Sequence, residues 1–239
     1  MVTLVLAVIA ALVMGLLFSG DIVLTVVLVV IAVGGWWLLR QRAGNEFLPA
    51  QIEESPLSRY LFASGEAALI WLPVRLALGW AWINAGWEKL NNPAWMNGQA
   101  LLGFWNSALT NAAGAHPTVG FDWYAGFLQT LVNANASGWF GPLIAIGEFV
   151  VGACLILGLF TGIAAFGAAL MNLNYMLAGS AGVNPLYFLF GIFLIMAWRN
   201  AGWIGLDRWL LPRLGTPWHR GGVGSGTATS PGASGARTT

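Results

Sequence analysis

The apolar run at residues 139–160 contains one charged residue, Glu148. A run of this length can cross a membrane as a helix, because about 20 residues at a 1.5 Å rise span a ~30 Å hydrocarbon core. A carboxylate at the centre of such a helix costs at least ~2.5 kcal/mol unless other groups of the protein compensate it. Glu148 is therefore predicted to face the interior of a helix bundle, as a functional or a structural pivot.

The composition also indicates that the chain lies in a membrane. Hydrophobic residues make up 58% of the chain and charged residues 8%, whereas soluble domains carry about 25% charged residues. We therefore predict an integral membrane protein with one membrane domain and terminal tails. Ten basic and nine acidic residues form no basic stripe for a nucleic acid. The single cysteine, Cys154, is expected to be a core residue, and motifs for haem, flavin, iron–sulfur or metal binding are absent.

Hydropathy predicts an all-α polytopic bundle of six spans. The first two spans form an N-terminal hairpin, although a secretory signal peptide is the alternative for the first; the missing basic n-region disfavours it. The expected domains are the hairpin at 1–40, a cytoplasmic connector at 41–64, a four-span domain at 65–210 and a disordered tail at 211–239. The predicted spans are residues 2–18, 22–39, 65–90, 139–160, 162–177 and 184–198.

The positions of lysine and arginine predict the orientation, because cytoplasmic loops are enriched in them. Arginines lie between the second and third spans and after the sixth, whereas residues 91–137 contain neither lysine nor arginine. Both termini are therefore predicted to be cytoplasmic and segment 91–137 external.

The external segment 91–137 carries aromatic residues among polar ones, as segments at a membrane interface do. Residues 94–109 and 121–134 are predicted to form short helices at the outer mouth of the bundle. An aromatic belt that anchors the protein is favoured over a lid above a substrate. His116 is interpreted as a surface histidine without a role, ahead of a proton-exchanging group.

Polar residues within the last four spans form a predicted site. Arg75 lies about ten residues, or ~15 Å, from the inner end of its span, and Glu148 and Asn172 come to similar depths from their own ends. We therefore predict an Arg75–Glu148 ion pair braced by Asn172. Tyr175 shares a helix face with Asn172. A structural lock and a catalytic role for the pair both stay open.

A second polar group, Asn84, Glu88 and Lys89, lies near the outer end of the third span, where long side chains usually extend to the interface. Small residues on the third and fourth spans predict that these two helices approach closely. The small-residue stripe is Ala77, Ala81 and Ala85, and the facing residues are Gly141, Ala145, Glu148 and Gly152.

Three stretches carry a family resemblance: RLALGWAWINAGWEKL at 75–90, GEFVVGACLILGLFTGIAAFGAALMNLNYMLAG at 147–179 and NAGWIGLDRWL at 200–210. They resemble the DoxX/DoxD family of bacterial and archaeal membrane proteins, over the four-span part from about residue 65 to 210. Gly162 departs from the family pattern, because an arginine is usual there and a cation at the inner face is missing. The matching positions are Arg75, Ala85-Gly86, Lys89-Leu90, Gly147-Glu148, Leu157-Gly158-Leu159 with Thr161, and Asn172 with Tyr175.

Family members named DoxD are the large subunit of thiosulfate:quinone oxidoreductase, which oxidises thiosulfate to tetrathionate and reduces a quinone. The resemblance implies a membrane subunit of a quinone-linked oxidoreductase in a prokaryotic cell membrane. Quinone is then the diffusible electron acceptor, a reduced sulfur compound the donor, and a small subunit or another oxidoreductase the partner. The expected site residues are Glu148 as proton donor with Arg75 in catalysis, and Asn172, Tyr175, Lys89 and Asn84 in substrate binding.

Two alternatives belong to other classes. A non-catalytic scaffold for oxidoreductases predicts a bundle without a cavity beside Glu148. A transporter of small solutes predicts a cavity that opens to water on alternate sides, although no inverted repeat is visible in the sequence. A cavity that opens to lipid favours quinone.

Overall fold

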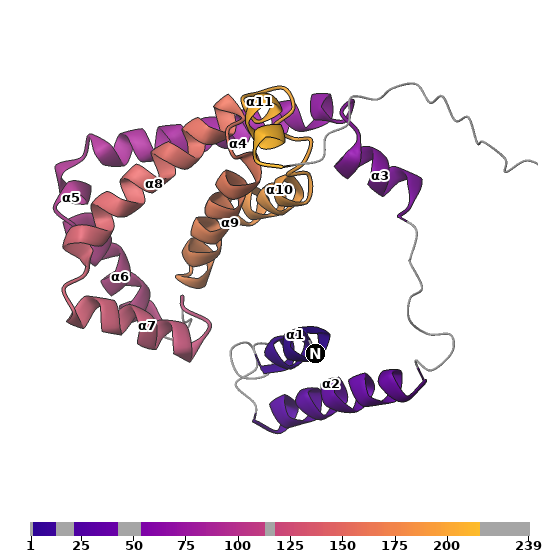
Figure 1. The fold of residues 1–239 in the computed structure, drawn as a ribbon. Coiled ribbons are helices and arrows are strands. Elements are labelled where there is room, and N and C mark those ends of the chain that lie inside the picture. The colour runs from indigo at the N-terminus through magenta and orange to yellow at the C-terminus, as the bar shows by residue number, and fades with distance from the viewer. Residues whose placement is uncertain (1, 13–21, 43–53, 113–117, 216–239) are drawn as a thin grey trace, which may run out of the picture.

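The computed structural model describes residues 2–12, 22–42, 54–112 and 118–215, and this part of the chain is all-helical, as predicted (Figure 1). The helices are α1 (Val2–Leu12), α2 (Ile22–Arg42), α3 (Pro56–Ala63), α4 (Ala68–Leu90), α5 (Pro93–Met96), α6 (Gln99–Ala112), α7 (Asp122–Asn133), α8 (Ser137–Leu157), α9 (Thr161–Leu177), α10 (Asn184–Met196) and α11 (Asp207–Arg213).

Among the described residues, α4 and α8 are long and apolar enough to cross a membrane, and part of α2 and all of α10 are shorter apolar helices. The outward faces of α4 and α8 are apolar, as lipid contact requires: Trp80, Trp87, Leu143 and Val150 are each at least 50% exposed. These observations support a membrane protein. Of the predicted first span, α1 covers residues up to Leu12, and residues 13–18 lie outside the described part.

Helices α4 and α8 form the main helix pair and approach closely through glycines. A Cβ on Gly79 would lie 3.0 Å from the carbonyl oxygen of Gly152, and a Cβ on Gly86 would lie 2.8 Å from the Cα of Phe149. The predicted close approach of these helices is confirmed, but α4 makes it with Gly79 and Gly86. The alanine stripe of α4, predicted to face α8, instead lines two cavities of the bundle.

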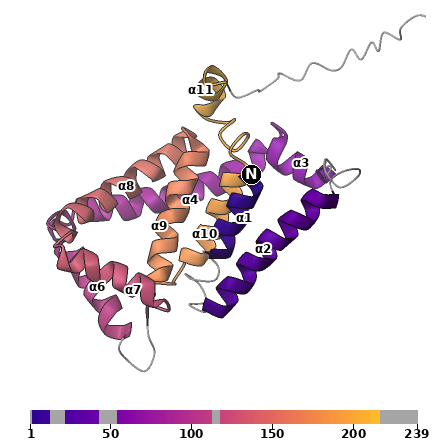
Figure 2. The ribbon, with the colours of Figure 1, turned by 60° about the horizontal axis from the view of Figure 1, so that its bottom comes forward.

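Helices α9 and α10 complete the bundle beside α4 and α8 (Figures 1 and 2). Its core consists of two tryptophans of α4 and aliphatic side chains from all four helices. The main buried core residues are Trp71, Leu78, Trp82, Leu155, Ala165, Ala168 and Leu194. Because α9 presents alanines to this core, α10 packs closely on it: a Cβ on Gly191 would lie 3.2 Å from that of Ala169.

Segment 91–137 forms the helices α5, α6 and α7 at one end of the bundle (Figure 2). The predicted helix at 94–109 is divided by Gly98, whose φ of +82° suits glycine and whose Cα packs on the backbone of α8. These helices have a core of their own, with Trp105, Tyr124 and Leu128 each at most 4% exposed. The segment is therefore part of the folded protein and not only an aromatic belt. His116 lies outside the described residues.

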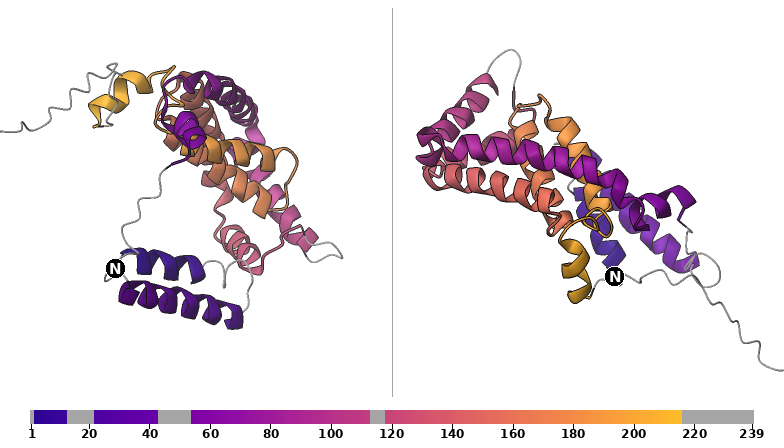
Figure 3. Two further views of the ribbon diagram at one scale, coloured as in Figure 1. Left: turned by 90° about the vertical axis from the view of Figure 1, so that its right-hand side faces the viewer. Right: turned by 90° about the horizontal axis from the view of Figure 1, so that it is seen from above.

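Helices α1 and α2 pack on each other and lie apart from the bundle (Figures 1 and 3). Helix α3 is joined to the bundle by Leu61, whose carbonyl oxygen accepts hydrogen bonds from Trp71 Nε1 at 2.8 Å and from Asn200 Nδ2 at 2.9 Å. The predicted hairpin and connector boundaries stay predictions, since residues 13–21 and 43–53 lie outside the described part.

Candidate functional site

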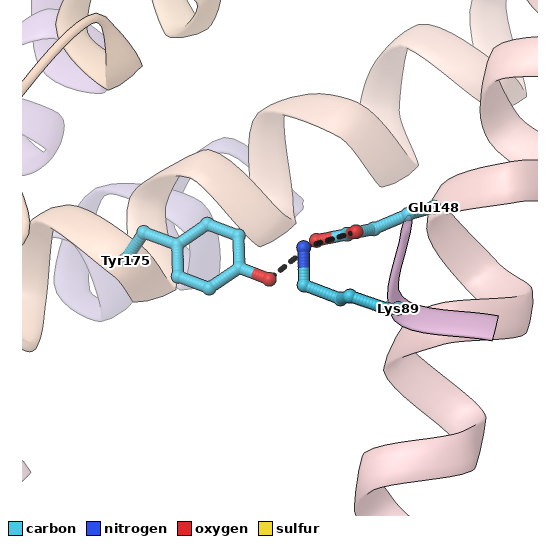
Figure 4. A network of polar contacts seen from close by, with 3 residues as sticks. All are labelled: Lys89, Glu148 and Tyr175. Carbon is cyan, nitrogen blue, oxygen red and sulfur yellow. Dashed lines mark hydrogen bonds and ion pairs between the residues drawn. The ribbon is translucent and has the colours of Figure 1, made fainter. Parts of the chain in front are cut away.

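Glu148 is fully buried and accepts two hydrogen bonds from two other helices (Figure 4). The Nζ of Lys89 on α4 lies 2.6 Å from Glu148 Oε2, and the hydroxyl of Tyr175 on α9 donates to Glu148 Oε1. The side chain of Lys89 is 16% exposed and that of Glu148 1%. An ion pair with both carboxylate oxygens bonded is a way to bury a charge inside a membrane helix.

The register of α4 and α8 explains why Lys89 is the partner of Glu148. Gly86 lies against Phe149, so Glu148 stands close to the last turn of α4. The ammonium group of Lys89 is also 5.0 Å from the centre of the Trp95 ring on α5, a distance at which a cation and an aromatic face attract. The prediction that Lys89 extends to the interface is wrong, because a carboxylate and a ring are within its reach inside the protein.

The predicted Arg75–Glu148 pair is wrong as well. Arg75 is fourteen residues from Lys89 on α4, about 21 Å along the helix axis. Its guanidinium donates to the carbonyl oxygens of Ala201 at 3.3 Å and Ile204 at 2.7 Å. The prediction compared distances from helix ends, but α8 extends beyond α4 and packs its first turns on α5, where Gly141 meets the carbonyl of Trp95. The middle of α8 therefore lies opposite the end of α4.

Arg75 belongs instead to a second buried charged group, which sequence reasoning missed. Asp207 at the start of α11 accepts hydrogen bonds from the backbone N–H groups of Phe160 at 2.6 Å and Thr161 at 2.8 Å. It thereby caps the N-terminus of α9, where a negative charge is favoured. Gly158, with φ +63°, allows the Arg75 guanidinium to pass directly over the turn between α8 and α9. We call this group the Arg75–Asp207 latch.

A cavity of about 320 Å³ lies beside the Lys89–Glu148–Tyr175 group, within the range of about 300–1,000 Å³ usual for small-molecule pockets. Three buried polar atoms on its lining residues have no hydrogen-bond partner: Trp82 Nε1, Asn172 Nδ2 and Asn172 Oδ1. Such atoms are costly to leave unpaired, so the cavity is built for a polar occupant. Its lining consists of Ala81, Trp82, Ala85, Lys89, Trp95, Phe104, Glu148, Asn172, Tyr175, Ser180, Val183, Asn184 and Tyr187.

Three of the predicted substrate-binding residues, Asn172, Tyr175 and Lys89, line this cavity together with Glu148. Asn84, which was predicted with them, is half-buried on α4 and is not part of the lining. Arg75, predicted as catalytic, is not part of it either. Trp82 was missed, since an aromatic residue in an apolar span gives no sign that its N–H is unpaired.

Segment 91–137 contributes two rings to the same cavity. Trp95 of α5 lies against Lys89, and Phe104 of α6 meets the Tyr175 ring edge-on at 6.1 Å. Segment 91–137 therefore forms part of the cavity wall, and its role as a lid above a substrate stays a prediction.

A second cavity, of about 340 Å³, lies between α4 and α10. Tyr187 lines both cavities. On α4, Ala77 lines the second and Ala81 the first, one helical turn apart. The two cavities therefore follow each other along the alanine stripe, and the lining of the second is almost entirely apolar. Its residues are Pro73, Val74, Ala77, Leu78, Tyr187 and Phe190.

Gly162, where the family resemblance leads one to expect an arginine, packs against Trp198. A Cβ on Gly162 would lie 2.6 Å from the Cβ of Trp198. A third cavity of about 380 Å³ beside it is lined by Gly162, Trp198 and apolar residues of α9 to α11. The position where the resemblance implies a cation is thus part of an apolar surface.

Comparison with known proteins supports the resemblance over the same helices. Residues 70–180, from α4 to the end of α9, match the family model of DoxX. No curated protein and no solved structure matches the chain significantly. The matched region contains Lys89, Glu148, Asn172 and Tyr175, which line the first cavity. Asp207 of the latch lies beyond the matched region. Residues 70–180 of this chain are therefore a domain of the DoxX family.

Proposed function

We propose that this protein is the membrane subunit of a quinone-linked oxidoreductase and binds the quinone ring in the cavity beside Glu148. The observation that carries the proposal is the cavity itself, in which a buried ion pair and three unpaired polar atoms surround space for a small molecule. A quinone ring fits such a lining, because it is flat and apolar with a polar oxygen at each end. The Lys89 ammonium, the Trp82 N–H and the Asn172 amide are donors for those oxygens.

The quinone accepts two electrons and two protons when it is reduced. In this proposal Glu148 is not the direct proton donor that the sequence predicted. Both oxygens of Glu148 already accept hydrogen bonds, so Glu148 is a charge partner that holds the protons of Lys89 and Tyr175 beside the cavity. Lys89, whose ammonium group carries three N–H donors, is then the group that hydrogen-bonds and protonates the quinone oxygen, and Glu148, held by Tyr175, positions it.

The electron donor is proposed from the DoxD resemblance alone. Two thiosulfate ions give up one electron each and join as tetrathionate, while quinone and two protons become quinol. A partner subunit is proposed on the same basis.

The apolar second cavity supports a lipid-soluble ligand. It continues from the first along Ala81 and Ala77, which gives an isoprenoid tail a place between α4 and α10. A water-soluble solute on a transport pathway would gain nothing from contact with such an apolar surface. This is the observation that sets quinone binding ahead of solute transport.

We also propose six spans, with both termini cytoplasmic and α5 to α7 at the outer face. In a Cys154→Ser background, a cysteine at Ser107 of α6 is expected to react with an impermeant maleimide in intact cells. A cysteine at the exposed Glu54 is expected to react only after lysis. The opposite pattern would overturn the orientation.

The test of the proposed function is binding and anaerobic reduction of a quinone by the purified protein, with a panel of reduced sulfur donors. Glu148→Gln keeps the side-chain shape and removes the charge partner of Lys89, so turnover per folded molecule should fall at least about tenfold, as it does when proton transfer is impaired. Glu88→Gln is the matched control, since Glu88 lies beside Lys89 on the exposed face of α4.

Unchanged activity per folded molecule in Glu148→Gln would overturn the role of Glu148. A protein that binds no quinone and changes cellular quinone reduction only in proportion to its amount would be a scaffold. Uptake of a solute by proteoliposomes, without quinone binding, would instead establish a transporter.

A further inference from the structure

Asn172 is fully buried in the middle of α9, and neither atom of its side-chain amide has a hydrogen-bond partner. It lines the cavity beside Glu148. The observation does not depend on how the amide is oriented, because exchanging Nδ2 and Oδ1 leaves a donor and an acceptor unpaired in the same place. A ligand that satisfies Asn172 must therefore accept one hydrogen bond and donate another.

The acceptor atom of Asn172, Oδ1, restricts the chemistry of the ligand more than the two donor atoms do. Trp82 Nε1 and Asn172 Nδ2 both donate, and any oxygen of a ligand satisfies them. Asn172 Oδ1 needs a donor, which a carbonyl group cannot supply and a hydroxyl group can.

A water molecule in the cavity is subject to the same requirement. It both donates and accepts hydrogen bonds, so it can satisfy Asn172. A ligand that displaces the water gains affinity only if it reproduces both hydrogen bonds. A hydroxyl group does so, and a carbonyl group leaves Oδ1 unpaired.

We infer that Asn172 makes the cavity select the hydroxyl-bearing, reduced form of its ligand over the carbonyl-bearing, oxidised form. This inference rests on the proposed function, under which the two forms are quinol and quinone. Asn172 is then the residue that distinguishes product from substrate. Tighter binding of quinol than of quinone also makes reduction of the bound quinone more favourable than reduction of free quinone.

The test measures the dissociation constants of a short-chain benzoquinone and of its quinol under anaerobic conditions, without a sulfur donor, for the protein in lipid nanodiscs. The wild-type protein should bind the quinol about five- to tenfold more tightly, as one additional hydrogen bond gives. In Asn172→Leu this ratio should fall to about one. Asn172→Ala provides the same comparison if leucine does not fit the site.

Two control variants separate recognition from folding. Trp82→Phe removes a donor that serves both forms equally, so both dissociation constants should rise and their ratio should stay as in the wild type. Asn84→Leu changes an asparagine on α4 outside the cavity lining and should leave both constants unchanged.

A wild-type protein that binds quinone as tightly as quinol would overturn the inference while leaving the proposed function intact. An Asn172→Leu ratio equal to that of the wild type would do the same. Failure of the wild-type protein to bind either form would overturn the proposed function, and the inference with it.

Discussion

The two ends of the α4–α8 pair each bury a positive and a negative side chain, but they treat these charges differently. At one end, Lys89 and Glu148 adjoin a cavity whose lining has unpaired polar atoms. At the other end, Arg75 donates to two carbonyl groups, Asp207 caps α9, and the residues of the turn pack tightly around them.

Unpaired atoms occur at the latch end too, namely Arg75 Nε, Thr161 Oγ1 and Asn200 Oδ1. They line none of the three cavities, whereas Trp82 and Asn172 line the first. The comparison shows that a buried charge in a membrane helix does not by itself identify a site. Charge together with space and unsatisfied hydrogen bonds identifies the Lys89–Glu148 end as the candidate site and the Arg75–Asp207 end as structural.

The largest effect that would test this distinction is expected at the latch. Asp207→Ala removes two buried hydrogen bonds from backbone N–H groups to a charged carboxylate. Each is worth about 1.5–3 kcal/mol, so the free energy of unfolding should fall by about 3–5 kcal/mol. Denaturant unfolding in detergent measures it. Asp122→Ala is the control, because Asp122 also begins a helix but is exposed. A loss no larger than that of the control would show that the latch does not stabilise the fold.

The next effect concerns the helix contact that joins the two ends. Gly152→Ala places a Cβ 2.7 Å from the carbonyl oxygen of Gly79, so α4 and α8 must separate, at a cost of about 1–3 kcal/mol. Because the shift also moves Glu148 relative to Lys89, quinone affinity should fall together with the melting temperature. Gly126→Ala in α7, where a Cβ meets nothing within 4 Å, should change neither. Equal effects of the two variants would contradict the glycine contact.

The sequence predicted the all-α class, the burial of Glu148, and the common face of Asn172 and Tyr175, because helical periodicity and the cost of a charge in lipid are local properties. It failed on the partners of the charges. Partner choice depends on helix register, which follows from contacts such as Gly86 with Phe149 and Gly141 with Trp95. The prediction that the alanine stripe faces α8 failed for a related reason. Small residues allow close helix packing, but they also leave space for a cavity.

A double-mutant cycle should show that Lys89 and Glu148 are coupled. Lys89→Met and Glu148→Gln each leave one partner of the ion pair without the other, whereas the double variant removes both charges. The coupling free energy should be about 1–2 kcal/mol, within the range for residues in contact. The control cycle with Arg75→Met and Glu148→Gln should be additive within about 0.5 kcal/mol, because their side chains lie far apart. Coupling in the Arg75 cycle alone would restore the pairing predicted from the sequence.

The smallest effect concerns the attachment of α7 to α9. Burial raises the pKa of Tyr124 to about 12, and its hydroxyl lies 3.1 Å from the carbonyl oxygen of Asn174. Since the unfolded pKa is about 10, the contribution of Tyr124 to stability is fully present below pH 10. It is lost as the pH rises from 10 through 12, because the unfolded chain releases the proton more readily.

Tyr124→Phe should therefore lower the free energy of unfolding by about 0.5–1.5 kcal/mol at pH 8, the usual net value of one hydrogen bond. The difference between wild type and variant should shrink as the pH approaches 12. Tyr60→Phe, at a position 42% exposed, is the matched control and should follow the wild-type curve. If the wild-type and Tyr124→Phe curves stay parallel from pH 8 to pH 12, the hydroxyl of Tyr124 does not hold α7 on α9. The cover over the site would then depend on apolar contacts such as that of Phe104 with Tyr175.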